Sequence, residues 1–146
     1  MSGKTMLMKR CLFQPFTESY MTTMVVEPIE VQYKDCSYIW WDTSSQNTLL
    51  QHNQYPLRHA NKVVVCYDAR SQESFGSACE MMDDLECEYV IRVATFGDLG
   101  CDARDPDDLL VSAKTGEGIL DLMTLLYDGS EVVHTTRGLL WSSVCF

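Results

Sequence analysis

Apolar positions recur along this chain with two different spacings, and each spacing predicts one kind of element. An apolar residue at every third or fourth position predicts helices over residues 4–13 and 74–86, and a third helix that begins after Gly118. Alternating or continuous apolar runs predict strands at residues 28–33, 37–42, 62–67, 89–95 and 109–111. The run at 62–67 is apolar throughout, which is typical of a strand buried on both faces of a parallel sheet.

Strands that alternate with helices predict an α/β fold with a mostly parallel sheet. The length of 146 residues suits a single domain. Periodicity stops at Asp128, so we expect the folded domain to span residues 1–127 and residues 128–146 to form an irregular tail. In such folds ligands bind beyond the carboxyl ends of the strands, so the loops that follow strands are where site residues are expected.

The charge of the chain narrows the classes of partner. With 21 acidic and 11 basic residues the net charge is −10, which argues against binding to nucleic acid or to an anionic membrane surface. Ten of the carboxylates lie between Glu80 and Asp108, together with two arginines. This acidic segment is either a solvated face or a surface that attracts a basic partner.

Other sequence features bear on the cellular compartment. No apolar run approaches the roughly 20 residues of a membrane-spanning helix, and no signal peptide is visible. The seven cysteines are odd in number and include no C-x-x-C pair, which favours free thiols in a reducing compartment. We therefore expect a cytoplasmic protein without a transmembrane segment. Cys145 fits no prenylation motif, so a prenyl anchor is not expected.

The first loop with recognisable chemistry stands at the start of the chain. Ser2-Gly3-Lys4-Thr5 directly precedes the first predicted helix and matches the second half of the phosphate-binding loop G-x-x-x-x-G-K-[ST]. In that loop glycine lets backbone N–H groups approach phosphate, lysine reaches the β and γ oxygens, and the hydroxyl binds Mg²⁺. The tetrapeptide alone is a weak signal, and its alternative is a flexible terminus with one lysine.

Further polar groups follow the later predicted strands. Asp42 ends the second strand, where a carboxylate suits a Mg²⁺ site, and Gln46 comes four residues later, where an amide can orient an attacking water. Asp98 follows the strand at 89–95, and Ser112 follows the last strand. The ordered series is a stronger signal than any one of these motifs.

Taken in order, the motifs resemble those of a Rab-type small GTPase of the Ras superfamily over about residues 3–127. The family's W-D-T-A-G-Q, V-Y-D, E-S-F and S-A-K read here, in that order, as Trp41–Gln46, Cys66–Asp68, Glu73–Phe75 and Ser112–Lys114. The segment Phe16–Thr23 resembles switch I of the Rab proteins, and it aligns Thr23 with the switch threonine.

The resemblance implies a three-layer P-loop NTPase-type fold that binds GTP or GDP with Mg²⁺ and acts as a switch in intracellular vesicle traffic. It implies that nucleotide is bound by Gly3, Lys4, Thr5, Asp98, Ser112, Ala113 and Lys114. It also implies Mg²⁺ ligands at Thr5, Thr23 and Asp42, and a catalytic Gln46 that positions water for GTP hydrolysis. Effector or regulator proteins would bind through residues 16–27 and 44–60, in the cytoplasm or peripherally on endomembranes.

The chain also departs from the family's architecture. It begins inside the phosphate loop, so the family's central first strand is missing. We expect residues 37–42 to pair with 62–67 instead, or the chain to fold poorly, because unpaired buried backbone groups cost about 1–3 kcal/mol each. Only 13 residues separate Asp98 from Ser112, so the family's helix at this point is missing and one face of the sheet should be less well covered.

Two motif changes bear on activity. Ser45 replaces the glycine whose N–H touches the γ-phosphate, and Thr95-Phe96-Gly97-Asp98 replaces N-K-x-D. Phe96 is either a platform that stacks on a base or a buried apolar side chain. Three functions therefore stay open: a GTP hydrolase of slow turnover, a degenerate pseudo-GTPase that acts only as a protein-interaction module, and an incomplete, non-functional fragment.

Overall fold

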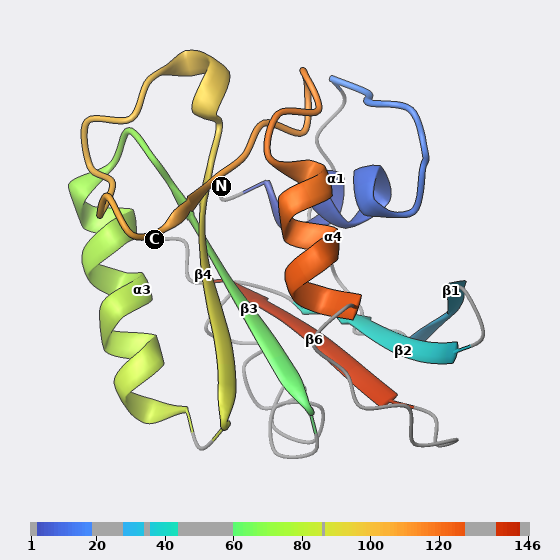
Figure 1. Ribbon diagram of the computed structural model, residues 1–146. Helices are drawn as coiled ribbons and strands as arrows, with labels where there is room; N and C mark the ends of the chain where they lie inside the picture. The colour runs from blue at the N-terminus through green and yellow to red at the C-terminus, as the bar shows by residue number, and fades with distance from the viewer. Residues whose placement is uncertain are drawn as a thin grey trace.

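The computed structural model describes residues 3–18, 28–33, 36–43, 60–85, 87–127 and 137–143 (Figure 1). The elements, in chain order, are α1 (Lys4–Cys11), β1 (Pro28–Tyr33), β2 (Cys36–Asp42), β3 (Lys62–Asp68), α3 (Gln72–Asp84), β4 (Tyr89–Thr95), the 3₁₀ helix η2 (Gly97–Leu99), β5 (Leu109–Leu110), α4 (Ile119–Tyr127) and β6 (Arg137–Ser143). The strands form one sheet in the order β1-β2-β6-β3-β4-β5. The β1–β2 pair is the predicted antiparallel hairpin, and the other neighbours pair in parallel.

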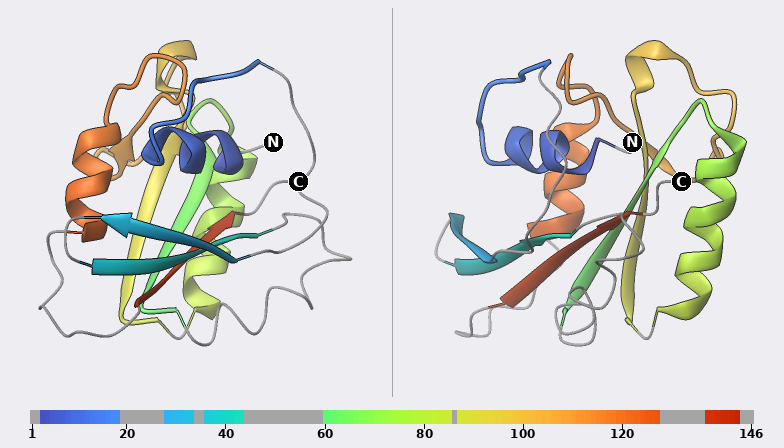
Figure 2. Two further views of the ribbon diagram at one scale, coloured as in Figure 1. Left: turned by 90° about the vertical axis from the view of Figure 1, so that its right-hand side faces the viewer. Right: turned by 180° about the vertical axis from the view of Figure 1, so that it is seen from behind.

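Helices cover both faces of the sheet, so the domain has three layers (Figures 1 and 2). On one face α3 packs over an apolar cluster that includes Val63 and Val65 of β3. On the other face α1 and α4 share a cluster in which Leu7 and Leu122 lie with Val64. Because β3 contributes to both clusters, it is buried on both faces, and the predicted α/β fold class is confirmed.

The predicted helices are present with small shifts at their ends. α1 ends at Cys11 rather than at residue 13, because Phe13 adopts a φ of 60° that a right-handed helix does not accept. α3 begins at Gln72, since the Ser71 hydroxyl accepts a hydrogen bond from the Ser74 N–H and caps the helix. The described segment between η2 and β5 contains no α-helix, as its length predicted.

β6 corrects two predictions from the sequence. Residues 137–143 are not part of an irregular tail but form a strand inside the sheet. The strands predicted at 37–42 and 62–67 do not pair with each other, because β6 lies between β2 and β3 and is parallel to both. The apolar periodicity of a segment is a local property, so it cannot show that the segment will pair between two strands that are distant in the sequence.

The register of β6 explains why the sheet closes around it. Tyr38 of β2 lies opposite Arg137, and Lys62 of β3 lies opposite Leu139. In this position β6 supplies hydrogen-bond partners for the backbone N–H and C=O groups along the inner edges of both β2 and β3. Buried backbone groups require such partners, so the C-terminal strand completes the centre of the sheet.

Cys11 marks the contact between α1 and α4. The side chain is 2% exposed and belongs to the cluster that also contains Leu122 and Leu126. Burial among apolar side chains raises the pKa of its thiol from 9.0 to about 12, because the thiolate loses its hydration. The thiol is therefore almost entirely protonated at neutral pH.

We expect iodoacetamide at pH 8 to modify Cys101 within minutes and to leave Cys11 unmodified, because Cys101 is exposed and only the thiolate reacts. Peptide mapping by mass spectrometry measures both rates on the same sample. The pKa shift also implies that the packing of Cys11 contributes stability fully below pH 9 and loses it as the pH rises towards 12. Equal labelling of the two cysteines would contradict the packing of α1 against α4.

Candidate functional site

The N-terminus of α1 presents backbone donors beside a buried lysine. Gly3 is the N-cap residue and adopts a φ of 70°, a left-handed conformation that glycine accepts without strain. Lys4 is the first helical residue, and it is 7% exposed. Because the cap residue is glycine, no cap side chain accepts from the first-turn N–H groups, and the helix dipole favours an anion there. The geometry suits a phosphate group.

Thr5 and Asp42 meet at the edge of this loop. The Thr5 Oγ1 hydroxyl donates a hydrogen bond of 2.6 Å to Oδ2 of Asp42, the last residue of β2. These residues are 37 positions apart, and packing of α1 over β2 brings them together. The sequence predicted both as metal ligands, and the structure places their oxygens side by side.

A hydroxyl beside a carboxylate is a donor set that fits Mg²⁺, which prefers hard oxygen ligands. Within the described ranges, no group of three or more His, Cys, Asp or Glu side chains is arranged to hold a metal ion. That absence is consistent with Mg²⁺, because this ion usually takes one or two protein oxygens and completes its shell with water and substrate phosphate. The pair therefore suits a metal that binds together with a nucleotide.

Asp98 and Ser112 form the second half of the site. Asp98 lies in η2, after β4, and its Oδ1 accepts a hydrogen bond of 2.6 Å from the buried Ser112 hydroxyl. The same hydroxyl accepts from the N–H of Thr115 at 3.1 Å, which orders the turn that contains Ala113 and Lys114. The loops after β4 and β5 are thereby fixed to each other, as a base-reading site requires.

Lys114 lies at the outer rim of this turn. Its Nζ is 3.7 Å from Oε1 of Glu18, and both side chains are well exposed. Exposed ion pairs contribute little to stability, so this contact does not hold Lys114 in one position. Of the predicted base-contacting residues, Ser112 is the one that the structure fixes most firmly.

Phe96 joins the two halves of the site. A Cβ atom on Gly3 would lie 3.3 Å from the tip of the Phe96 ring, so the glycine permits this close approach. The Arg70 guanidinium lies 5.0 Å from the centroid of the Phe96 ring, within cation–π distance. Phe96 is half-buried, and the ring face that Arg70 covers is not available to a ligand.

Arg70 is held in place by Asp68 at the end of β3. Its Nε and Nη2 donate to the two carboxylate oxygens at 2.9 and 2.7 Å. Burial by itself raises the pKa of the Asp68 carboxyl, but the hydrogen bonds and the charge of Arg70 outweigh burial and hold the pKa below its ordinary value. Nearby Asp98 also favours the charged form of Arg70.

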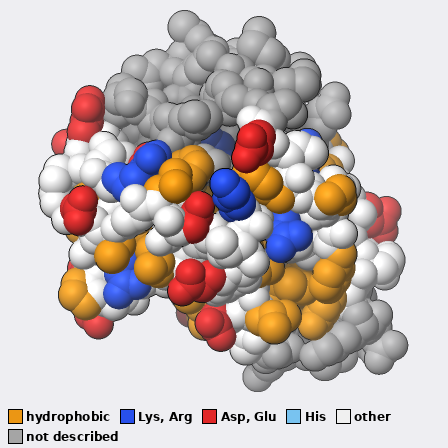
Figure 3. Space-filling view, turned by 90° about the horizontal axis from the view of Figure 1, so that it is seen from above, with side chains coloured by type: hydrophobic (Ala, Val, Ile, Leu, Met, Phe, Trp, Pro, Cys, Tyr) orange, Lys and Arg blue, Asp and Glu red, His pale blue; other side chains and the backbone are white. Residues whose placement is uncertain are grey.

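Figure 3 looks down on the end of the molecule where these loops meet, and basic, acidic and apolar side chains are interspersed there. Of the predicted site residues, Thr23 and Gln46 lie outside the described part of the chain. Most of the predicted effector segments, 16–27 and 44–60, lie outside it as well.

Sequence reasoning missed a buried polar network behind the site. Asp108 accepts hydrogen bonds from the Tyr67 hydroxyl at 2.7 Å and from Nε of Arg92 at 2.6 Å. Nη2 of Arg92 also donates to Asp105 at 2.9 Å. The signal available in the sequence was an arginine in the middle of a mostly apolar predicted strand, since such a charge needs a partner when it is buried.

Comparison with known protein families agrees with this geometry. The model of the Ras family matches residues 1–127, which include α1, the end of β2 and the loops around Asp98 and Ser112. The chain belongs to the Ras family. It is thus related to the small GTP-binding proteins, and guanine nucleotide is the ligand expected for this Ras-family chain.

A similar solved structure is the Methanosarcina barkeri Roco2 RocCORdC bound to GDP. The TM-score is 0.67 with 18% sequence identity, and the match covers 88% of the Ras-family chain and 45% of the Roco2 chain. At that identity the match concerns the fold, and the chain spans less than half of the Roco2 chain. In the described part of the Ras-family chain, no helix has the length and apolarity that crossing a membrane requires.

Proposed function

We propose that this Ras-family chain is a Rab-like switch that binds GDP and GTP with Mg²⁺ at the end of the sheet where α1 begins. The contact between Thr5 and Asp42 carries the proposal, because it joins the hydroxyl of the phosphate loop to a carboxylate at the end of β2. Lys4 and the N–H groups of the first turn supply positive potential for the phosphates beside that pair.

Each described residue takes a defined part in binding. Thr5 and Asp42 would hold Mg²⁺, and the ion would neutralise charge on the phosphates when bound. Asp98 accepts from the ring nitrogens of guanine, and the Ser112 hydroxyl keeps that carboxylate oriented. Lys114 completes the base-contacting loop with Ala113. GTP hydrolysis is proposed from the family, with Gln46 orienting the water, and unaided turnover is slow.

A role in intracellular vesicle traffic is part of the same proposal. It is supported by the Rab-type segments Trp41–Gln46 and Ser112–Lys114, not by the fold, because one fold hosts many functions. Effectors or regulators would read residues 16–27 and 44–60. The protein would act in the cytoplasm or peripherally on endomembranes.

The first test is binding of a fluorescent GDP analogue to the purified chain with about 5 mM Mg²⁺, a concentration that exceeds any Kd expected for the ion. We expect saturable binding that weakens at least about 10-fold in Lys4→Ala, because a charge-assisted contact to phosphate is worth about 1.5–3 kcal/mol. The matched control is Lys9→Ala, which removes the same charge from the same helix, and it should bind like the unaltered chain.

A second variant tests the metal part of the proposal. Asp42→Asn keeps a polar group beside Thr5 but removes the carboxylate charge. We expect it to lose most of the gain in nucleotide affinity that Mg²⁺ gives, while affinity in excess EDTA changes little; Asp121→Asn, exposed on α4, is the charge-matched control. A folded chain that binds no nucleotide would refute the switch and favour the pseudo-GTPase, to which the Phe96 substitution already points.

A further inference from the structure

The sheet ends in a strand that is only half covered. β4 runs from Tyr89 to Thr95, but β5 pairs with it only at Val93 and Ala94. Residues 89–92 therefore have no strand on their outer side within the described part of the chain. The cause is the short connection after η2, which supplies neither a helix nor a longer strand to cover this edge.

The backbone direction of β4 can be assigned from its bonded end. The Ala94 C=O accepts from the Val111 N–H at 2.8 Å, on the β5 side of the strand. In a strand, the N–H and C=O of one residue point the same way, and the direction alternates from residue to residue. The N–H and C=O of Val90 therefore point to the open side. Such unpaired groups are a template for another strand.

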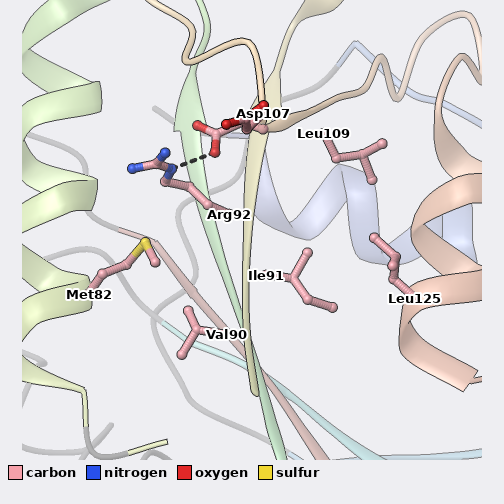
Figure 4. Close-up of a pocket in the computed structure, with 8 residues that line it drawn as sticks. Met82, Val90, Ile91, Arg92, Asp107, Leu109 and Leu125 are labelled. Atoms are coloured by element: carbon pink, nitrogen blue, oxygen red, sulfur yellow. Dashed lines mark hydrogen bonds and ion pairs between the residues drawn. The ribbon is translucent and has the colours of Figure 1, made fainter. Parts of the chain in front are cut away.

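The open edge lies at the bottom of a groove between two helices (Figure 4). The groove has a volume of about 420 Å³, with Met82 of α3 on one wall and Leu125 of α4 on the other. Val90 belongs to the apolar cluster under α3, whereas Ile91 belongs to the cluster under α4. A strand laid in this groove would alternate its side chains between the two helices, as β4 does.

The charged side chains around the groove favour a positively charged ligand. The single cation in the lining, Arg92, is already paired with Asp105 and Asp108, whereas Asp107 is exposed at the rim. At the nearby C-terminus of α3, Asp83 and Asp84 are exposed, and the last turn of α3 contains no basic residue. Carboxylates at that end of a helix add to the negative dipole, so a cation placed there is favoured.

We propose that the edge of β4 from Tyr89 to Arg92 is a docking site for an extended, basic segment of a partner protein, which joins the sheet as an additional strand. About four residues of that segment would pair with β4, over roughly 13 Å. Its apolar side chains contact Met82 and Leu125, and its lysines or arginines approach Asp107 and the end of α3. This use of the acidic segment does not depend on nucleotide binding.

A synthetic peptide with a run of valines flanked on both sides by lysines, acetylated and amidated at its ends, is the probe, because valines at successive positions reach both helices. We expect saturable binding to the full chain by fluorescence anisotropy. Affinity should fall at least about 10-fold when glutamate replaces lysine, because the glutamates are repelled by the carboxylates around the groove. Methylation of every second backbone nitrogen should weaken binding to a similar degree, since it removes the donors for strand pairing. Amide exchange at Val90 should slow when the lysine peptide binds.

Matched variants on α4 locate the site. Leu125→Lys removes the apolar wall and repels the peptide, whereas Leu120→Lys makes the same change on the same helix outside the groove. We expect at least about a 10-fold loss of peptide affinity in the first, because a leucine that the peptide would cover is lost and a repulsion is added. The second should change the affinity by less than about two-fold. Both leucines are exposed, so folding should survive in both variants.

Several outcomes would overturn the proposal. Equal affinity of the two leucine variants, or of the methylated and unmethylated peptides, would show general attraction to an acidic surface rather than strand addition. Self-association of the chain that is lost in Leu125→Lys, together with no peptide binding, would make a second copy the occupant. Protection of amides elsewhere without protection of Val90 would place the peptide at another site.

Discussion

Removing residues 128–146 is expected to abolish cooperative folding, although the match to the Ras family ends at residue 127. The deletion removes β6 from the centre of the sheet, between β2 and β3. Each backbone group left unpaired in a buried sheet costs about 1–3 kcal/mol, against a total stability of about 5–15 kcal/mol for a domain. Loss of one central strand leaves several such groups and exceeds that total. Thermal unfolding followed by circular dichroism measures the effect.

Two smaller changes distinguish the contribution of β6 to stability from that of the residues that follow it. Removing only residues 144–146 should shift the stability by less than about 1 kcal/mol, since β6 stays complete. Leu140→Pro should lower it by about 3 kcal/mol or more, because proline removes a backbone donor from a strand that is paired on both sides. Leu140→Ile keeps that donor and is its control. A chain of residues 1–127 that melts cooperatively at the same temperature as the full chain would contradict the assignment of β6.

Replacing Asp108 by alanine is expected to lower the free energy of unfolding by about 3 kcal/mol, because it leaves a half-buried arginine and a buried hydroxyl without their shared partner. The Asp108 side chain is 6% exposed and accepts from both Tyr67 and Arg92. Asp105 lies more exposed and compensates only part of the Arg92 charge. Urea unfolding measures the change.

Asp107→Ala is the matched control for Asp108→Ala. Asp107 is the exposed neighbour, so its removal should change stability by less than about 0.5 kcal/mol. Burial and then the Asp108 carboxylate raise the pKa of the Tyr67 hydroxyl above its ordinary value of 10.0. The contribution of the network is therefore complete below pH 10 and is lost as the pH rises above that value. Equal effects of the two substitutions would refute a buried network.

Much of the local structure followed from the sequence, because spacing of apolar residues is a local property. Residues 89–95 form the predicted strand without any shift, and the hairpin and three helices lie where apolar periodicity indicated. The phosphate-loop residues and Asp42 were identified by motif, and the structure brings Thr5 and Asp42 together. Asp98 and Ser112 likewise meet, since parallel strands end at the same edge of the sheet.

Other features were decided by tertiary structure alone. Residues 137–143 have little periodicity of their own, and they form a strand because β2 and β3 offer backbone partners on both sides. Strand formation depends strongly on such context. The network around Asp108 and the groove beside β4 also depend on which segments lie next to each other. The sequence by itself determined the elements from α1 to α4 and the candidate nucleotide-binding residues. The central strand β6, its pairing and the open edge required the assembled sheet, because hydrogen bonding between strands joins residues that are far apart in the chain.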